Sequence, residues 1–186
     1  MAPEPGSRRG RRNDPDRRDR IIDACLDVIA EVGVAGASHR RIAEAAGVPL
    51  GSMTYHFTGI DELLREAFTR FGTEISERFE KRMAAASDLA SARDAVAAII
   101  LSDVYGDPRE LVLSHELYTL AARDPAYREL TSAWMRRSRD ALEQWFDPET
   151  AHMVDAIITG VSIHRALDVV DRDPAEVALA VARITT

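Results

Sequence analysis

Apolar residues recur every three or four positions along most of the chain after residue 16, which is the spacing of one face of an α-helix. No stretch shows the alternation of apolar and polar residues that marks a half-buried strand. A first helix is expected from residue 16 or 17 to Val32, because Gly33 follows its apolar stripe. That stripe consists of Ile22, Cys25, Leu26 and Ile29. The pattern predicts an all-α protein.

Two short helices joined by a glycine turn are expected within residues 38–57. The hydroxyl of Ser38 can accept a hydrogen bond from a free amide of the first helical turn, so Ser38 is a good N-cap. Gly47 ends the first short helix, since glycine tolerates the left-handed conformation of a sharp turn. The second begins at Pro49, where a missing amide costs nothing. Their shared buried face is expected to contain Ile42, Ala43, Ala46, Met53 and Phe57. This arrangement is a helix-turn-helix, whose second helix lies in the major groove of DNA.

The same stretch resembles the DNA-binding domain of the tetracycline-repressor (TetR) family of transcriptional regulators. The resemblance covers about 50 residues and rests on I-A-E-A-A-G at 42–47, on Val48, on G-S at 51–52, on Y-H-F at 55–57 and on the following D-E-L-L. It implies a homodimeric repressor that a small molecule releases from its operator, a pseudo-palindromic duplex DNA. The residues expected to bind DNA are Ser38, His39, Arg40, Leu50, Gly51, Ser52, Thr54, Tyr55 and His56.

The chain departs from this family at Ile60, where a lysine that contacts a phosphate is usual. Isoleucine cannot neutralise a phosphate, so the chain loses one ionic contact per subunit there, unless the arginines at Arg8–Arg12 replace it. Alternatively, Ile60 is a packing residue turned inwards. The arginine-rich segment belongs to residues 1–15, which are expected to form a disordered basic arm. This arm is equally consistent with a DNA contact and with a solubilising tail.

Residues 16–60 are expected to form the helix-turn-helix domain, and residues 61–186 a helical domain for ligand binding and dimerisation. The second domain opens on a helix of about 25 residues, whose stripe is Leu64, Phe68, Phe71, Ile75, Phe79 and Met83. Such a helix is long enough to belong to both domains. It either transmits a conformational change to the DNA-binding helices or serves as a spacer.

Five further helices are expected at residues 89–105, 108–122, 125–146, 148–170 and 174–184. The last four each open on an Asp-Pro pair, in which aspartate caps the helix and proline occupies its first turn. The last two are apolar on nearly every side, so they need cover from a second protein surface. A two-fold partner offering the same two helices makes a four-helix dimer interface, where Gly160 permits close approach.

A ligand pocket is expected where polar and aromatic residues interrupt buried helix faces, as His115, Glu116 and Tyr118 do. The proposed ligand-binding residues are His115, Tyr118, Trp134, Met135, His152 and Ser162. Each is individually also explained as an ordinary core or surface residue. No catalytic, metal-binding or cofactor-binding motif is evident, which argues against an enzyme.

Charge and composition agree with a cytoplasmic DNA-binding regulator. The net charge is −7, yet the first 72 residues hold 11 arginines and 11 acidic residues, so the negative charge lies away from the expected DNA face. The single Cys25 lies on an apolar stripe, which favours a buried, inert thiol. No stretch is apolar enough for a membrane span or a secretory signal. Two alternatives remain: a dimeric helical interaction module, and a DNA binder without a ligand. A salt-dependent gel shift distinguishes the module from either DNA binder.

Overall fold

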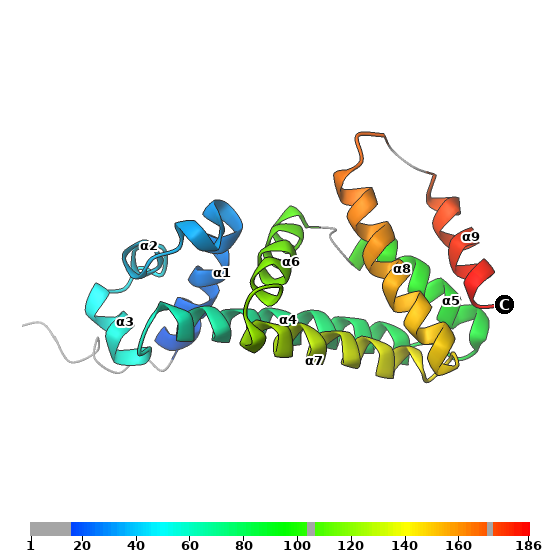
Figure 1. Cartoon of the computed structure of the whole chain (residues 1–186), viewed down its shortest axis with the longest axis horizontal. Coiled ribbons are helices and arrows are strands. Elements are labelled where there is room, and N and C mark those ends of the chain that lie inside the picture. The colour runs from blue at the N-terminus through cyan, green and yellow to red at the C-terminus, as the bar shows by residue number, and fades with distance from the viewer. Residues whose placement is uncertain (1–15, 104–106, 171–172) are drawn as a thin grey trace, which may run out of the picture.

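The computed structural model describes residues 16–103, 107–170 and 173–186, and this part of the chain is helical without strands. The predicted fold class is therefore confirmed. The basic arm expected at residues 1–15 lies outside the described residues. The elements are α1 (Arg17–Gly36), α2 (His39–Ala45), α3 (Leu50–His56), α4 (Ile60–Ala84), α5 (Leu89–Ala98), a π-helical turn (Ile99–Asp103), α6 (Pro108–Ala121), α7 (Pro125–Leu142), α8 (Pro148–Leu167) and α9 (Pro174–Ile184) (Figure 1).

The four Asp-Pro helix starts are confirmed. In each case the aspartate carboxylate accepts a hydrogen bond from a first-turn amide, and proline is the first helical residue. These caps satisfy amides that the helix itself leaves without acceptors, which fixes where each helix begins. The capping residues are Asp107, Asp124, Asp147 and Asp173.

Several predicted helix ends differ from the observed ones. Helix α1 breaks at Gly33, as predicted, but one further turn continues it to Gly36. The predicted ends at 146 and 170 are wrong, since α7 ends at Leu142 and α8 at Leu167. After α7 the chain turns so that Phe146 is buried, and after α8 Asp168 takes an extended conformation. The end expected at residue 105 lies outside the described residues.

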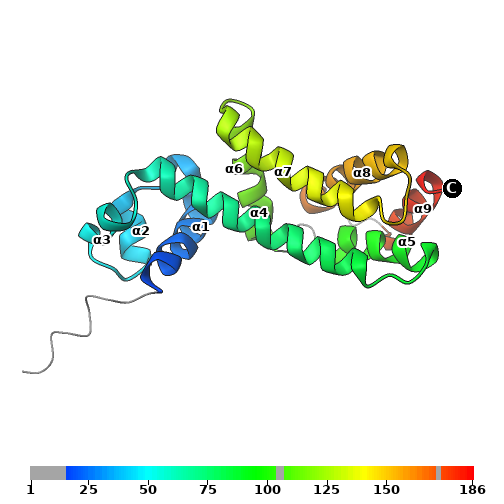
Figure 2. The same ribbon diagram turned by 90° about the horizontal axis from the view of Figure 1, so that it is seen from below.

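Helix α4 runs along the long axis of the molecule and joins two hydrophobic cores (Figures 1 and 2). The first core packs α1, α2, α3 and the first half of α4 against α6 and the start of α7. The second core packs the end of α4 against α5, α7, α8 and α9. The first core thus extends beyond the domain boundary expected after residue 60, because α6 packs against α1. None of the described helices is long and apolar enough to cross a membrane.

Candidate DNA interface and ligand pocket

Helices α2 and α3 form the predicted helix-turn-helix. The Ser38 hydroxyl accepts a hydrogen bond from the Arg41 amide, at 3.3 Å, and so caps α2. Gly47 adopts a φ of 64°, and Val48 then donates its amide to the Ala43 carbonyl at 2.9 Å. Pro49 precedes α3 as its cap and is not its first residue as expected. The turn therefore folds α3 back against α2 with the glycine in the conformation that it tolerates best.

The outward face of α3 is open to solvent. Tyr55 is 84% exposed and Leu50 is 54% exposed, and a methyl group added at Gly51 would meet no atom within 4 Å. The Thr54 hydroxyl, also exposed, donates to the Gly51 carbonyl at 3.2 Å, which leaves its oxygen free to accept. The face is suited to a close approach by a large partner, because its residues are small or polar around the projecting Leu50 and Tyr55 side chains.

The remaining predicted DNA contacts border this face. Arg40 is exposed and has no ion pair with any residue in the described ranges, whereas Ser52 is half-buried. His56 is half-buried and meets the Tyr55 ring edge to face, with centroids 4.9 Å apart. His39 is half-buried, and its Nε2 atom is buried with no hydrogen-bond partner among the described residues. The arrangement brings the α3 residues together on one surface and places Arg40 at the start of α2.

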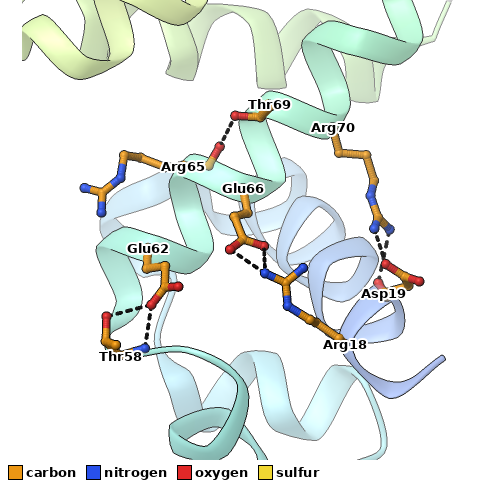
Figure 3. A network of polar contacts seen from close by, with 8 residues as sticks. All are labelled: Arg18, Asp19, Thr58, Glu62, Arg65, Glu66, Thr69 and Arg70. Atoms are coloured by element: carbon orange, nitrogen blue, oxygen red, sulfur yellow. Dashed lines mark hydrogen bonds and ion pairs between the residues drawn. The ribbon is translucent and has the colours of Figure 1, made fainter. Parts of the chain in front are cut away.

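Ion pairs and hydrogen bonds fasten α1 and Thr58, which lies between α3 and α4, to α4 (Figure 3). Arg18 on α1 pairs with Glu66 on α4 at 2.5 Å, and its guanidinium also lies 5.2 Å from the centre of the Phe57 ring, just after α3. Glu62 accepts hydrogen bonds from both the amide and the hydroxyl of Thr58, each at 2.6 Å. These two hydrogen bonds lower the pKa of Glu62. Together these contacts fix the orientation of α4 relative to α1 and to the end of α3.

Ile60, the residue that departs from the expected lysine, is half-buried and packs against the first core. This placement agrees with the packing alternative, in which the side chain turns inwards. A lysine at this position would have to withdraw its stem from the core before its ammonium group reached a phosphate.

A pocket of about 80 Å³ opens between α4, α6 and α7. Its lining is Phe68, Thr69, Gly72, Thr73, Ser76, Leu117, Leu130, Ala133, Trp134 and Arg137. The three hydroxyls donate to backbone carbonyls of α4 one turn earlier, so their oxygens remain available as acceptors. Arg137 makes two hydrogen bonds to Glu80, at 2.6 and 2.8 Å, and these lower the pKa of Glu80. The wall combines an aromatic face, hydroxyl oxygens and one paired cation.

The structure does not gather all six predicted ligand residues around one pocket. Trp134 lines it, and Tyr118 stacks on Trp134 with ring centroids 5.9 Å apart and an interplanar angle of 7°. The half-buried His115 hydrogen-bonds the Leu111 carbonyl of its own helix at 2.7 Å. Three others lie elsewhere: Met135 and His152 are exposed, and the Ser162 hydroxyl is buried with no hydrogen-bond partner in the described ranges.

Sequence reasoning missed most of the pocket wall. The hydroxyl residues Thr69, Thr73 and Ser76 recur at helical spacing on α4, beside the apolar stripe. This second stripe was the available signal, since small hydroxyl residues along one side of a long helix allow another helix or a ligand to approach. Arg137 gave no comparable signal among the many arginines of α7.

Comparison with known proteins decides the family. Residues 21–67 match the family described as bacterial regulatory proteins, tetR family, and residues 87–186 match the tetracyclin repressor-like C-terminal domain. The second match alone covers more than half of the chain. The chain belongs to the TetR family. The resemblance inferred from the sequence is thus confirmed, and membership makes the protein a helix-turn-helix transcriptional regulator.

Solved structures related to this TetR-family chain cover nearly all of it. SCO7518 from Streptomyces coelicolor A3(2) is 57% identical, with 92% of this chain and 99% of that chain covered and a TM-score of 0.86. The multidrug binding protein EbrR, complexed with ethidium, is 32% identical, with 91% and 99% covered and a TM-score of 0.75.

The transcriptional regulator BetI 1 of Chromohalobacter salexigens is 36% identical over 86 residues, which are 46% of this chain and 42% of BetI 1. This chain therefore spans less than half the length of that curated relative.

Proposed function

We propose that this TetR-family regulator is a homodimeric cytoplasmic repressor that binds a pseudo-palindromic operator through α3 and leaves it when a small molecule binds. The observation that carries the proposal is the open outer face of α3, held in place by the contacts around Arg18 and Glu62. A recognition helix must present uncovered side chains to base edges from a fixed backbone.

The proposed dimer interface consists of α8 and α9. Large apolar residues on these helices remain exposed, with Met153 at 43%, Leu167 at 61% and Leu179 at 51%. Several large exposed apolar side chains on neighbouring helices are typical of a protein contact, and a two-fold contact buries the same residues of both subunits. Gly160 is exposed on α8 with open space around it, so a second helix can approach there.

The proposed ligand is a small aromatic molecule that enters beside Trp134. At about 80 Å³ the pocket is smaller than the 300 Å³ or more of ordinary ligand sites, so binding must enlarge it. Support comes from the relative EbrR, which was solved with ethidium, proflavin and malachite green. The stacked pair of Tyr118 and Trp134 is the natural place for another flat ring to insert, because aromatic faces stack favourably.

Selection of genomic DNA fragments by the purified protein tests DNA recognition. We expect enrichment of a pseudo-palindromic sequence, and Arg40→Ala and Thr54→Ala should weaken binding to it about tenfold without unfolding the protein. Arg136→Ala is the matched control, because Arg136 is exposed on α7, outside the helix-turn-helix, and has no ion pair in the described ranges. Failure to enrich any sequence would favour a dimeric interaction module instead.

Ligand release is tested with ethidium as the probe. Binding beside Trp134 should quench tryptophan fluorescence, and it must lower operator affinity by the same factor by which operator lowers ethidium affinity. Trp134→Ala should abolish the quenching. Tight ethidium binding that leaves operator affinity unchanged would exclude ethidium as an inducer, and an aromatic compound library without any coupled compound would contradict ligand control.

A further inference from the structure

Glu116 on α6 reaches across to the break in α1. Its Oε2 atom accepts a hydrogen bond from the Val34 amide at 3.2 Å, although the two residues are 82 positions apart in the chain. Its Oε1 atom would lie 2.7 Å from a methyl group added at Gly33. The carboxylate therefore occupies the space beside Gly33 that any other residue would fill.

The backbone at Gly33 explains why a carboxylate fits there. Gly33 has a φ of 71° and a ψ of 170°, so the amide that follows points away from the direction of the preceding helix. A buried or half-buried amide without an acceptor is costly, and a carboxylate is a strong acceptor for it. Glu116 thus caps the short turn from Val34 to Ala37, as an N-cap residue would, but from another helix.

Residues 33–38 connect α1 to α2, and α2 holds the other end of this connector. Arg41 on α2 donates from Nη1 to the Gly36 carbonyl at 2.8 Å, and Ser38 then caps α2. Residues 33–38 are consequently fixed by α6 on one side and by α2 on the other. Because α3 packs against α2, the position of the connector bears on the position of α3.

Helix α6 also forms part of the pocket wall. Leu117, next to Glu116, lines the pocket, and Tyr118 stacks on Trp134. Near its start, Arg109 makes two hydrogen bonds to Asp27 on α1, at 3.0 and 2.8 Å. One continuous helix therefore contacts the pocket, the body of α1 and the break that precedes α2.

We propose that Glu116 is a positioning residue that couples the pocket to the DNA-binding helices through the amide of Val34. With α6 in the observed position, the carboxylate holds the connector so that α2 and α3 are set for DNA. A ligand that displaces Trp134 moves Tyr118 and with it α6, which withdraws the carboxylate and frees the connector. The inference rests on the proposed function for its link to DNA, whereas the contact itself does not depend on it.

Two substitutions and one control test this role. Glu116→Ala removes the acceptor, whereas Glu116→Gln keeps an oxygen of the same reach without the charge. Glu129→Ala removes an exposed glutamate of α7 that has no partner in the described ranges. For each variant we measure amide hydrogen exchange, melting temperature and affinity for the selected operator, with Trp134→Ala as a second background.

In Glu116→Ala the amides of residues 34–45 should exchange at least tenfold faster, while those of α8 and α9 stay as in the wild type. Operator binding should weaken about tenfold, the factor that corresponds to one lost charge-assisted hydrogen bond. Glu116→Gln should restore most of both values, and Glu129→Ala should change neither. In the Trp134→Ala background the effect of Glu116→Ala on operator affinity should shrink, because the two residues act through the same helix.

Wild-type exchange and wild-type operator affinity in Glu116→Ala would overturn the inference. So would a variant whose exchange rises equally in all helices and whose affinity falls only in proportion to its folded fraction, because Glu116 would then be merely stabilising. If Glu116→Ala does not fold, Glu116→Leu, which keeps an apolar side chain at this position but also lacks the acceptor, decides by the same measurements. If the wild type selects no operator, the proposed function fails, yet the exchange of residues 34–45 still tests the contact.

Discussion

Asp155 on α8 is a carboxylate that burial disfavours in its ionised form. Burial raises its pKa, although Ser138 and Arg139 of α7 both donate hydrogen bonds that act in the opposite direction. The side chain of Asp155 is 16% exposed and that of Arg139 is 30% exposed, so the pair is only partly hydrated. Desolvation outweighs pairing here, as it often does for partly buried ion pairs.

The sign of this shift predicts the pH dependence of stability. The folded pKa of Asp155 lies above its ordinary value of 3.8. Ionisation of Asp155 therefore lowers the free energy of unfolding as the pH rises from 3.8 through the raised pKa, and the full loss applies above the raised pKa. Asp155→Asn, which cannot ionise, should therefore raise the free energy of unfolding at pH 7, and the gain should shrink as the pH falls towards 4. Urea unfolding at several pH values measures both, with Asp140→Asn on the exposed side of α7 as control. A loss of stability at pH 7 would mean that the ion pair outweighs desolvation.

Ile60 gives a second prediction for a single residue. Because its side chain packs on the first core, Ile60→Lys should lower the free energy of unfolding by about 1 kcal/mol and leave the salt dependence of operator binding unchanged. Ile60→Leu, which keeps the apolar volume, is the control. If the lysine instead reached a phosphate, the slope of log affinity against log salt would steepen by about 0.9 per subunit.

Within the helix-turn-helix, two glycines have opposite roles. A methyl group at either Gly47 or Gly51 meets no atom within 4 Å, but only Gly47 has a positive φ. Gly47→Ala should therefore destabilise the fold by about 1 kcal/mol through backbone strain alone. Gly51→Ala should stabilise α3 by roughly 0.5–1 kcal/mol, since alanine is the better helix former.

Operator binding gives a second test of the Gly51→Ala variant. Gly51→Ala should weaken it about tenfold despite the more stable fold, because the methyl group projects from the proposed DNA face and hinders close approach. Urea unfolding and fluorescence anisotropy on the selected operator measure stability and binding in the same samples. A Gly51→Ala variant that is stabilised and binds normally would place DNA away from the start of α3.

At the level of elements, the parts that local chemistry specifies were predictable. Asp-Pro starts, the Ser38 cap and the turn at Gly47 each depend on a few neighbouring residues, and all three are confirmed. The contact of Glu116 with Gly33 was not predictable, because it joins segments that only tertiary packing brings together. The pocket residues were predicted only in part for the same reason. Periodicity shows that a helix has a buried face, but it does not show which other helix covers that face. On α8, apolar on nearly all sides, no polar face indicated that His152 is exposed and Ser162 buried.

For the whole molecule, the decisive question is whether α8 and α9 pair with a second copy. Leu179→Glu places a charge on the proposed interface, where burial without a partner is strongly unfavourable, so the protein should sediment as a monomer. Val112→Glu on α6 is the control, since Val112 is also partly exposed but lies on a helix outside the interface. The monomer should bind the full operator at least a hundredfold more weakly, because two half-sites no longer act together. A Leu179→Glu variant that remains dimeric would place the interface elsewhere.

Because α4 is long, a small tilt at one of its ends produces a large displacement at the other. Its 25 residues span about 37 Å, from the second core to the helix-turn-helix. For a rigid rod of that length, a tilt of about 5° at one end displaces the other end by about 3 Å, nearly the 3.4 Å rise between successive bases along a DNA strand. Under the proposed function, a tilt of α4 of this size at the far end would displace α3 by nearly the spacing of one base step on the operator.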